Sequence, residues 1–344
     1  NLCGGSHSKI KKPRCWRRQG NMRKGRNRKM KENEAGVITK EITFPSADGK
    51  HTVHGYFWVP ESGDVRAIIQ LSHGMCEYVQ RYDAWARRFA AAGYVFCGND
   101  HLGHGKTAGG LDGRGFTAKR GGAEFLVKDL HTMTVRACEE YPDLPVVLYG
   151  HSMGSFAARK YLTEYGNALS AALISGTGGP GNPTGVAKLL AHAVGAFKGA
   201  EYRSPMIKNL AFGAYNKRFE EEHDTFSWLT RDKAEREKYA ADPYCNFDFT
   251  AAGYDTLFSL LGEVSRRDWA KRVPKKLPIF LFAGDSDPVG SYGKGVRAVY
   301  DRLIAAGADA KLKLYPGGRH EMHNEINRDE VFDDLITFLT EVLG

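Results

Sequence analysis

The sequence of 344 residues has little cysteine and no long hydrophobic run. Its six cysteines are scattered without a C-x-x-C pair, which argues against a disulfide framework and against a zinc site. No run of about 18 apolar residues occurs, so the sequence predicts no transmembrane helix. Because unpaired thiols are typical of a reducing compartment, we expect a cytoplasmic protein.

The positive charge of the chain is concentrated in its first tenth. The net charge is +9, but residues 1–34 hold 12 Lys or Arg and only two Glu. This segment lacks apolar periodicity, and it is either an arm for an anionic partner or an appended extension. Trp16 is its only aromatic residue, too few for base stacking, and the chain begins with Asn. We therefore expect a disordered or non-native extension, which argues against a nucleic-acid partner.

The remaining residues alternate between strand and helix patterns. Residues 36–44 and 51–59 alternate apolar and polar side chains around a turn, which predicts a β-hairpin. Short apolar runs that predict buried strands lie at residues 66–72, 93–97, 144–149, 171–175, 278–283 and 311–315. Amphipathic segments that predict helices lie at residues 82–92, 125–141 and 296–306, after residue 152, and at the end of the chain. This order predicts an α/β fold with a mainly parallel central sheet and helices on both faces.

Residues 181–276 interrupt the alternation of strands and helices. They contain helix-forming segments with many charged and aromatic side chains. We therefore divide the folded part into a core of residues 35–180 and 277–344 and a helical cap of residues 181–276. A segment inserted between two strand ends is well placed to cover a site at the carboxyl edge of the sheet.

A nucleophile motif follows the strand at residues 144–149. Residues 150–154 read GHSMG, a G-x-S-x-G pattern with an apolar strand before it and a helix after it. Such a motif holds the serine in a strained turn, and bulky side chains two residues before or after it would collide with nearby backbone. Ser152 is therefore the candidate nucleophile.

Two backbone N–H groups are candidates for an oxyanion hole. In this architecture one donor follows an early strand and the other follows the nucleophile. Those positions are Met75, in the HGMCE sequence at residues 73–77, and Met153.

A serine nucleophile needs a base and a carboxylate that orients the base. The strand at residues 278–283 ends in GDSDP, which offers Asp285 and Asp287, and we favour Asp287. The strand at residues 311–315 leads into His320, the favoured base, with His323 as the alternative. Both loops follow strands. Along the chain the candidates stand in the order serine, acid, histidine, which is the order typical of this architecture.

Three local sequences resemble ligand-binding motifs but fail on spacing. His320 and His323 are three residues apart, whereas the H-E-x-x-H zinc motif needs four. Residues 105–107 read GKT, but Asp100 stands where a phosphate loop needs glycine. A calcium loop starting at Asp285 would need Glu where Val296 stands. We therefore expect no metal and no cofactor.

Taken together, the ordered motifs resemble the α/β-hydrolase superfamily, and within it the monoacylglycerol lipase and lysophospholipase branch of serine-aminopeptidase-like hydrolases. The resemblance covers about residues 37–344. The motifs that carry it are HGMCE at 73–77, DHLGHG at 100–105, GHSMG at 150–154, GDSDP at 284–288 and HE at 320–321, with FSWLTRD at 226–232 typical of the cap. Cys76 and Tyr78 depart from the residues common in the family.

The resemblance implies a serine ester hydrolase with catalytic Ser152, Asp287 and His320 and oxyanion donors Met75 and Met153. It also implies that polar side chains recognise the hydroxyl groups of the alcohol. The matching residues are Glu77, Arg81 and His323. An alternative for Glu77 and Arg81 is a structural ion pair.

The expected substrate is a small acyl ester such as a monoacylglycerol, cleaved through an acyl-enzyme. A lysophospholipase, a thioesterase, an aromatic-acid esterase and a peptidase of the same branch remain open, as does a non-catalytic binding protein. Any contact with a membrane is expected to be peripheral and through the cap.

Overall fold

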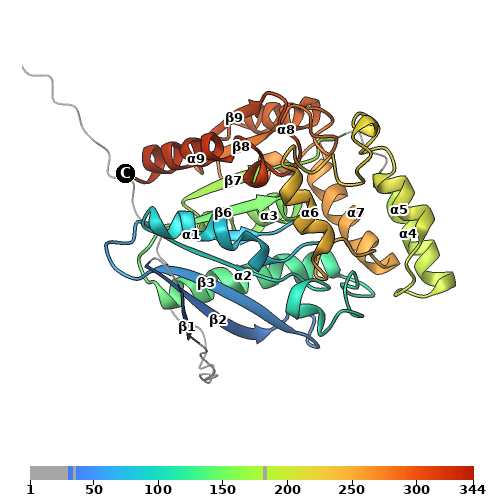
Figure 1. Cartoon of the computed structure of the whole chain (residues 1–344), viewed down its shortest axis with the longest axis horizontal. Coiled ribbons are helices and arrows are strands. Elements are labelled where there is room, and N and C mark those ends of the chain that lie inside the picture. The colour runs from blue at the N-terminus through green and yellow to red at the C-terminus, as the bar shows by residue number, and fades with distance from the viewer. Residues whose placement is uncertain (1–29, 34–35, 181–183) are drawn as a thin grey trace, which may run out of the picture.

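The computed structural model describes residues 30–33, 36–180 and 184–344 (Figure 1). The interpretation of the basic segment at residues 1–34 therefore lies outside the described residues, except at residues 30–33. Met30–Asn33 form a short strand, β1, which the sequence did not predict.

The described residues form one nine-stranded sheet in the order β1-β2-β3-β5-β4-β6-β7-β8-β9. The strands after β1 are β2 (Val37–Pro45), β3 (Thr52–Pro60), β4 (Ala67–Ser72), β5 (Tyr94–Asn99), β6 (Val146–His151), β7 (Ala171–Ser175), β8 (Ile279–Gly284) and β9 (Ala310–Tyr315). The first four strands in this order pair antiparallel, and every pair from β5 to β9 is parallel. The predicted hairpin, the other predicted strands and the mainly parallel α/β fold are confirmed.

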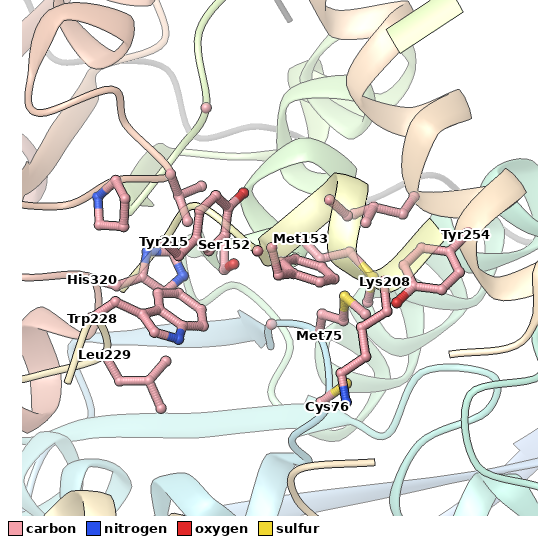
Figure 2. A pocket seen from close by; sticks show the side chains of 18 of the residues that line it. Met75, Cys76, Ser152, Met153, Lys208, Tyr215, Trp228, Leu229, Tyr254 and His320 are labelled. Carbon is pink, nitrogen blue, oxygen red and sulfur yellow. The ribbon is translucent and has the colours of Figure 1, made fainter. Parts of the chain in front are cut away.

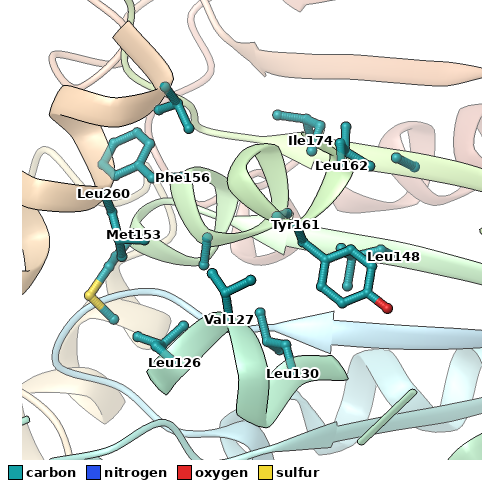
Figure 3. Packing of buried hydrophobic residues seen from close by; sticks show 14 of the residues in the cluster. Leu126, Val127, Leu130, Leu148, Met153, Phe156, Tyr161, Leu162, Ile174 and Leu260 are labelled. Atoms are coloured by element: carbon teal, nitrogen blue, oxygen red, sulfur yellow. The ribbon is translucent and has the colours of Figure 1, made fainter. Parts of the chain in front are cut away.

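Helices cover both faces of the sheet, as predicted. The core helices are α1 (Asp83–Ala91), α2 (Gly122–Glu140), α3 (Met153–Tyr165), α8 (Lys294–Ala305) and α9 (Arg328–Leu343). Because side chains alternate along a strand, Val146 and Leu148 of β6 join the cluster with α2, α3 and α8, while Val147 and Tyr149 join the cluster with α1 and α9. Figure 3 shows the first cluster, in which the Leu130 side chain of α2 is packed below α3.

The predicted insertion between β7 and β8 is helical. It contains α4 (Thr184–Lys198), α5 (Pro205–Phe212), α6 (Lys233–Ala241) and α7 (Ala251–Ser265). The last of these packs against α2, α3 and α4, and its Leu260 belongs to the same buried cluster as α3. In Figure 1, α4 and α5 lie at the outer edge of the molecule, beyond α7.

No helix among residues 30–33, 36–180 and 184–344 combines the length and the apolar character that crossing a bilayer requires.

Leu130 and Val135 on α2 offer a matched test of the packing. The Leu130 side chain is fully buried, whereas Val135 is 43% exposed on the same helix. We expect Leu130→Ala to lower the free energy of unfolding by about 2–5 kcal/mol because it leaves a cavity. We expect Val135→Ala to change it by about 0.5 kcal/mol or less, as measured by urea denaturation. Equal effects of the two substitutions would contradict the assigned register of α2.

Candidate active site

Ser152 lies at a sharp turn between the end of β6 and the start of α3. Its φ of 53° and ψ of −122° lie in a region that non-glycine residues rarely adopt. A Cβ on Gly150 would lie 2.6 Å from the Cβ of Ala158, and a Cβ on Gly154 would collide with the carbonyl oxygen of Ser72. The two glycines of the motif are therefore required by close packing around the strained serine.

His320 and Asp287 form a buried pair at the carboxyl edge of the sheet. The Nδ1 atom of His320 lies 3.0 Å from Oδ2 of Asp287. The other carboxylate oxygen of Asp287 accepts the Val289 N–H at 2.8 Å, which fixes the orientation of the group. Asp285, by contrast, is exposed and accepts the Gly317 N–H at 2.8 Å, as a turn residue does. The structure thus places Asp287, and not Asp285, beside His320.

The carboxylate of Asp287 controls the protonation of His320. Burial, the largest single effect, lowers the pKa of this imidazole. The charge and the hydrogen bond of Asp287, together with the charges of Glu321 and Glu77, outweigh burial and raise the pKa of His320 above its ordinary value. Burial also acts on His323, where it dominates and lowers the pKa to about 3. Of the two histidines, only His320 is paired with a carboxylate that would stabilise an imidazolium.

Ser152 and His320 line one cavity of about 720 Å³ (Figure 2). Its walls are mainly apolar and aromatic, with Tyr215, Trp228 and Phe258 among them. The ring of Trp228 lies 5.1 Å from that of His320. The serine and the histidine therefore both face a cavity whose walls suit an apolar ligand.

Both candidate oxyanion donors line the same cavity. Met153 is the first residue of α3, so its N–H has no acceptor within the helix. Met75 lies in the loop after β4, and the neighbouring Gly74 is close enough that a Cβ there would be 3.2 Å from the Cβ of Ser152. The two backbone segments thus flank the serine.

The three residues expected on the alcohol side are placed differently from one another. Glu77 lines the cavity, but its carboxylate accepts hydrogen bonds from the Gly74 N–H, from the Tyr82 hydroxyl at 2.8 Å and from Arg81 at 2.7 Å. Arg81 also donates two hydrogen bonds of 2.7 Å to Glu321 and is not part of the cavity wall. The structure therefore contains the ion pair that was the alternative for Glu77 and Arg81.

His323 is buried away from the cavity. Its ring stacks on Tyr82 at 4.4 Å and packs against Trp85 and His151. Among the described residues, no protein group forms a hydrogen bond with either of its ring nitrogens. The predicted contact of His323 with an alcohol is therefore not favoured by the structure, since His323 does not line the cavity.

Two residues of the site stand in motifs noted in the sequence but were given no role there. Glu321 is the bidentate partner of Arg81, and Trp228 stands beside His320. Glu321 adjoins His320 in the chain, which is a weak signal, but its partner lies 240 residues away. Only the folded chain brings these groups together.

A mainly parallel sheet, with a serine at a strand–helix turn and a His–Asp pair at the same edge, is the architecture of an α/β-hydrolase.

Comparisons with known proteins agree with this class. The family described as serine aminopeptidase, S33, matches residues 63–327. A monoacylglycerol lipase of Mycolicibacterium smegmatis is 30% identical over 306 residues, which cover 88% of this chain and 98% of that protein. A monoglyceride lipase of Rattus norvegicus is 30% identical over 292 residues, which cover 82% and 83%.

Solved structures give the same result. A thermostable carboxyl esterase from Bacillus coagulans, in complex with glycerol, has a TM-score of 0.84 and 32% identity, covering 89% of this chain and 99% of that one. The chain belongs to the serine aminopeptidase S33 family of α/β-hydrolases.

The His320–Asp287 pair leads to a prediction about pH. An imidazole must be neutral to accept a proton, so the rate of ester hydrolysis should fall as the pH drops through the raised pKa of His320. We expect the acid limb of kcat/KM for a p-nitrophenyl ester to have its midpoint above 6.5, the ordinary imidazole value. Asp287→Asn should lower kcat by about 10⁴-fold and move this midpoint to lower pH.

Asp285→Asn is the matched control, because Asp285 is a nearby acid that does not contact His320. We expect it to keep a near wild-type rate and pH profile. If kcat fell as far in Asp285→Asn as in Asp287→Asn, the assignment of Asp287 as the catalytic acid residue would be contradicted.

Proposed function

We propose that the protein hydrolyses carboxylic esters of the monoacylglycerol type, or other small acyl esters, through an acyl-enzyme on Ser152. The observation that carries this proposal is that Ser152 and an Asp287-bound His320 open into one apolar cavity. The monoacylglycerol lipases and the carboxyl esterase among the relatives support the same reaction.

The first half of the reaction forms the acyl-enzyme. The Oγ of Ser152 attacks the acyl carbonyl carbon while its proton passes to Nε2 of His320. Asp287 holds the Nδ1 proton and stabilises the imidazolium. The bond to the alcohol oxygen then breaks, and Nε2 gives the proton to that leaving oxygen.

Water completes the cycle. It attacks the acyl carbonyl carbon and gives a proton to Nε2 of His320. The bond between that carbon and Oγ of Ser152 then breaks, Nε2 returns the proton to Oγ, and the carboxylic acid leaves. In both halves the N–H groups of Met75 and Met153 donate to the negatively charged oxygen, and one such donor is typically worth about 3–4 kcal/mol.

The shape and polarity of the cavity support an ester with a hydrocarbon acyl group. A cavity of about 720 Å³ with apolar and aromatic walls would exclude water and bind an acyl chain. We place α4, α5 and α6 in the cap over this cavity, since Val186 of α4 and Tyr239 of α6 line it. Because α7 packs on the core helices, we assign it to the core layer.

A peptidase that binds a free amino terminus is the second candidate, because the family description names an aminopeptidase. Such an enzyme needs an unpaired carboxylate to hold the substrate ammonium group. Glu77 and Glu321 line the cavity, but both are paired with Arg81. This pairing favours the ester substrate.

The cap also supports peripheral contact with a lipid surface. Apolar side chains of α4 and α5 are exposed, with Phe197 89% and Leu189 69% exposed. Val186 and Leu210 are exposed as well and line the cavity, so this apolar surface is continuous with the cavity wall. An apolar helix face of this kind can lie in the interfacial region of a bilayer.

Ser152→Ala tests the nucleophile, and a substrate panel tests the substrate class. We expect the rate at which the variant hydrolyses p-nitrophenyl esters and monoacylglycerols to fall by about 10⁶-fold, because no other group can form the acyl-enzyme.

In the substrate panel, the wild type should prefer monoacylglycerols over lysophospholipids, acyl thioesters, aromatic-acid esters and aminoacyl amides of matched size. Full activity of Ser152→Ala would refute the mechanism, and a preference for aminoacyl amides would favour the peptidase.

Substitutions of Leu189 and Phe197 test the contact with a lipid surface. Because neither side chain lines the cavity, Leu189→Ser with Phe197→Ser should abolish co-sedimentation with phosphatidylcholine vesicles and leave the hydrolysis of p-nitrophenyl butyrate unchanged. Val135→Ser, which exposes a polar group on α2 instead, is the control and should bind vesicles like the wild type. Unchanged vesicle binding by the cap variant would exclude this surface.

A further inference from the structure

The Met75 N–H belongs to the same peptide unit as the carbonyl group of Gly74. No cis peptide bond occurs among the described residues, so this unit is trans and planar. In a trans peptide the C=O and N–H bonds point in opposite directions. Any group that fixes the direction of the Gly74 carbonyl therefore also fixes the direction of the Met75 N–H.

His73 holds that carbonyl group. Its Nδ1 atom lies 2.8 Å from the Gly74 oxygen, and its Nε2 atom accepts the His101 N–H at 3.0 Å. Because Nε2 acts as an acceptor, the ring proton must be on Nδ1, which donates to Gly74. The ring is completely buried, and burial, together with the neighbouring His101 and His104, keeps the pKa of His73 well below its ordinary value. His73 is thus neutral, with one tautomer selected by its two partners.

The backbone on either side of this peptide is held by two more buried side chains. Glu77 accepts the N–H of Gly74, and Nε2 of His104 accepts the N–H of Cys76 at 3.3 Å. The Glu77 carboxylate is itself held by Tyr82 and Arg81. The N–H and C=O groups of Gly74 and the N–H of Cys76 are therefore all hydrogen-bonded to buried side chains. Met75 itself lines the cavity.

We propose that His73 and Glu77 are positioning residues that aim the Met75 N–H at the oxyanion. The inference rests on the proposed function, and it assigns Glu77 to the oxyanion loop rather than to recognition of the alcohol. The loop has little freedom to shift, because Gly74 packs directly against Ser152. A rotated Gly74–Met75 peptide would turn the donor away and present the carbonyl oxygen in its place.

Two matched pairs of variants of this chain test the proposal. His73→Asn keeps an N–H donor near the position of Nδ1, and His73→Leu removes it. Glu77→Gln keeps an oxygen acceptor for Gly74, and Glu77→Met removes it. We expect the Leu and Met variants to lower kcat by about 10²-fold, as for loss of one oxyanion donor, with KM changed by about threefold or less. The Asn and Gln variants should recover at least about tenfold of this loss.

Two substrates separate positioning from recognition of the alcohol. A positioning role lowers kcat by the same factor for p-nitrophenyl butyrate and for monobutyrin, because the oxyanion forms with either leaving group. Recognition of glycerol by Glu77 would instead raise KM for monobutyrin alone, and that result would overturn the proposal for Glu77. The thermal unfolding transition shows whether the His73→Leu variant is folded. A folded variant with near wild-type kcat would overturn the proposal for His73.

The tautomer of His73 provides a measurement that does not depend on turnover. In ¹⁵N-labelled wild-type protein, the ring nitrogen shifts should show a proton on Nδ1 and none on Nε2. A proton on Nε2 would overturn the positioning role even if ester hydrolysis is found. Absence of ester hydrolysis in the wild type would refute the proposed function, while the tautomer would still decide whether His73 holds the loop.

Discussion

The strained turn at Ser152 is the constraint on which the rest of the site depends. The φ of Ser152 is positive, and the nearby Gly154 lies so close to the carbonyl oxygens of Ser72 and His73 that a Cβ there would collide with them. The turn that carries the nucleophile and the loop that carries Met75 are therefore closely packed against each other. Because β4 and β6 are parallel neighbours, both turns emerge at the same edge of the sheet.

Buried polar networks hold the loops around this turn. One network uses neutral histidines, in which His101 fixes the tautomer of His73. The other is the ionic bridge from Glu77 through Arg81 to Glu321, which joins the loop after β4 to the loop that carries His320. Breaking a buried network of this kind leaves an unpaired charge or polar group, at a cost of several kcal/mol. Buried pairs in and behind the cavity wall thus stabilise the geometry of the site.

The cap contributes an apolar environment and is anchored on the His320 side. Its segment at residues 226–232 runs beside the histidine loop, where the Glu321 N–H donates to the Leu229 carbonyl oxygen at 2.7 Å. Arg319 donates to Ser227 and pairs with Glu222. On the other side, α4 and α5 present exposed apolar side chains. The cap therefore contributes both to the wall of the cavity and to an exposed apolar surface.

Local patterns in the sequence determined the fold and the loops that carry the chemistry. Apolar runs predicted the parallel strands, and the order of motifs predicted that Ser152, Asp287 and His320 follow strand ends, where a parallel sheet gathers such groups at one edge. The tertiary structure alone decided which side chains pair with one another. It joined Arg81 to Glu321 across 240 residues, placed His323 away from the cavity, packed α7 on the core and turned His73 toward Gly74. Such pairings depend on the distances and relative orientations of segments that lie far apart in the chain. The periodicity of side chains along the sequence determines neither the distances nor the orientations.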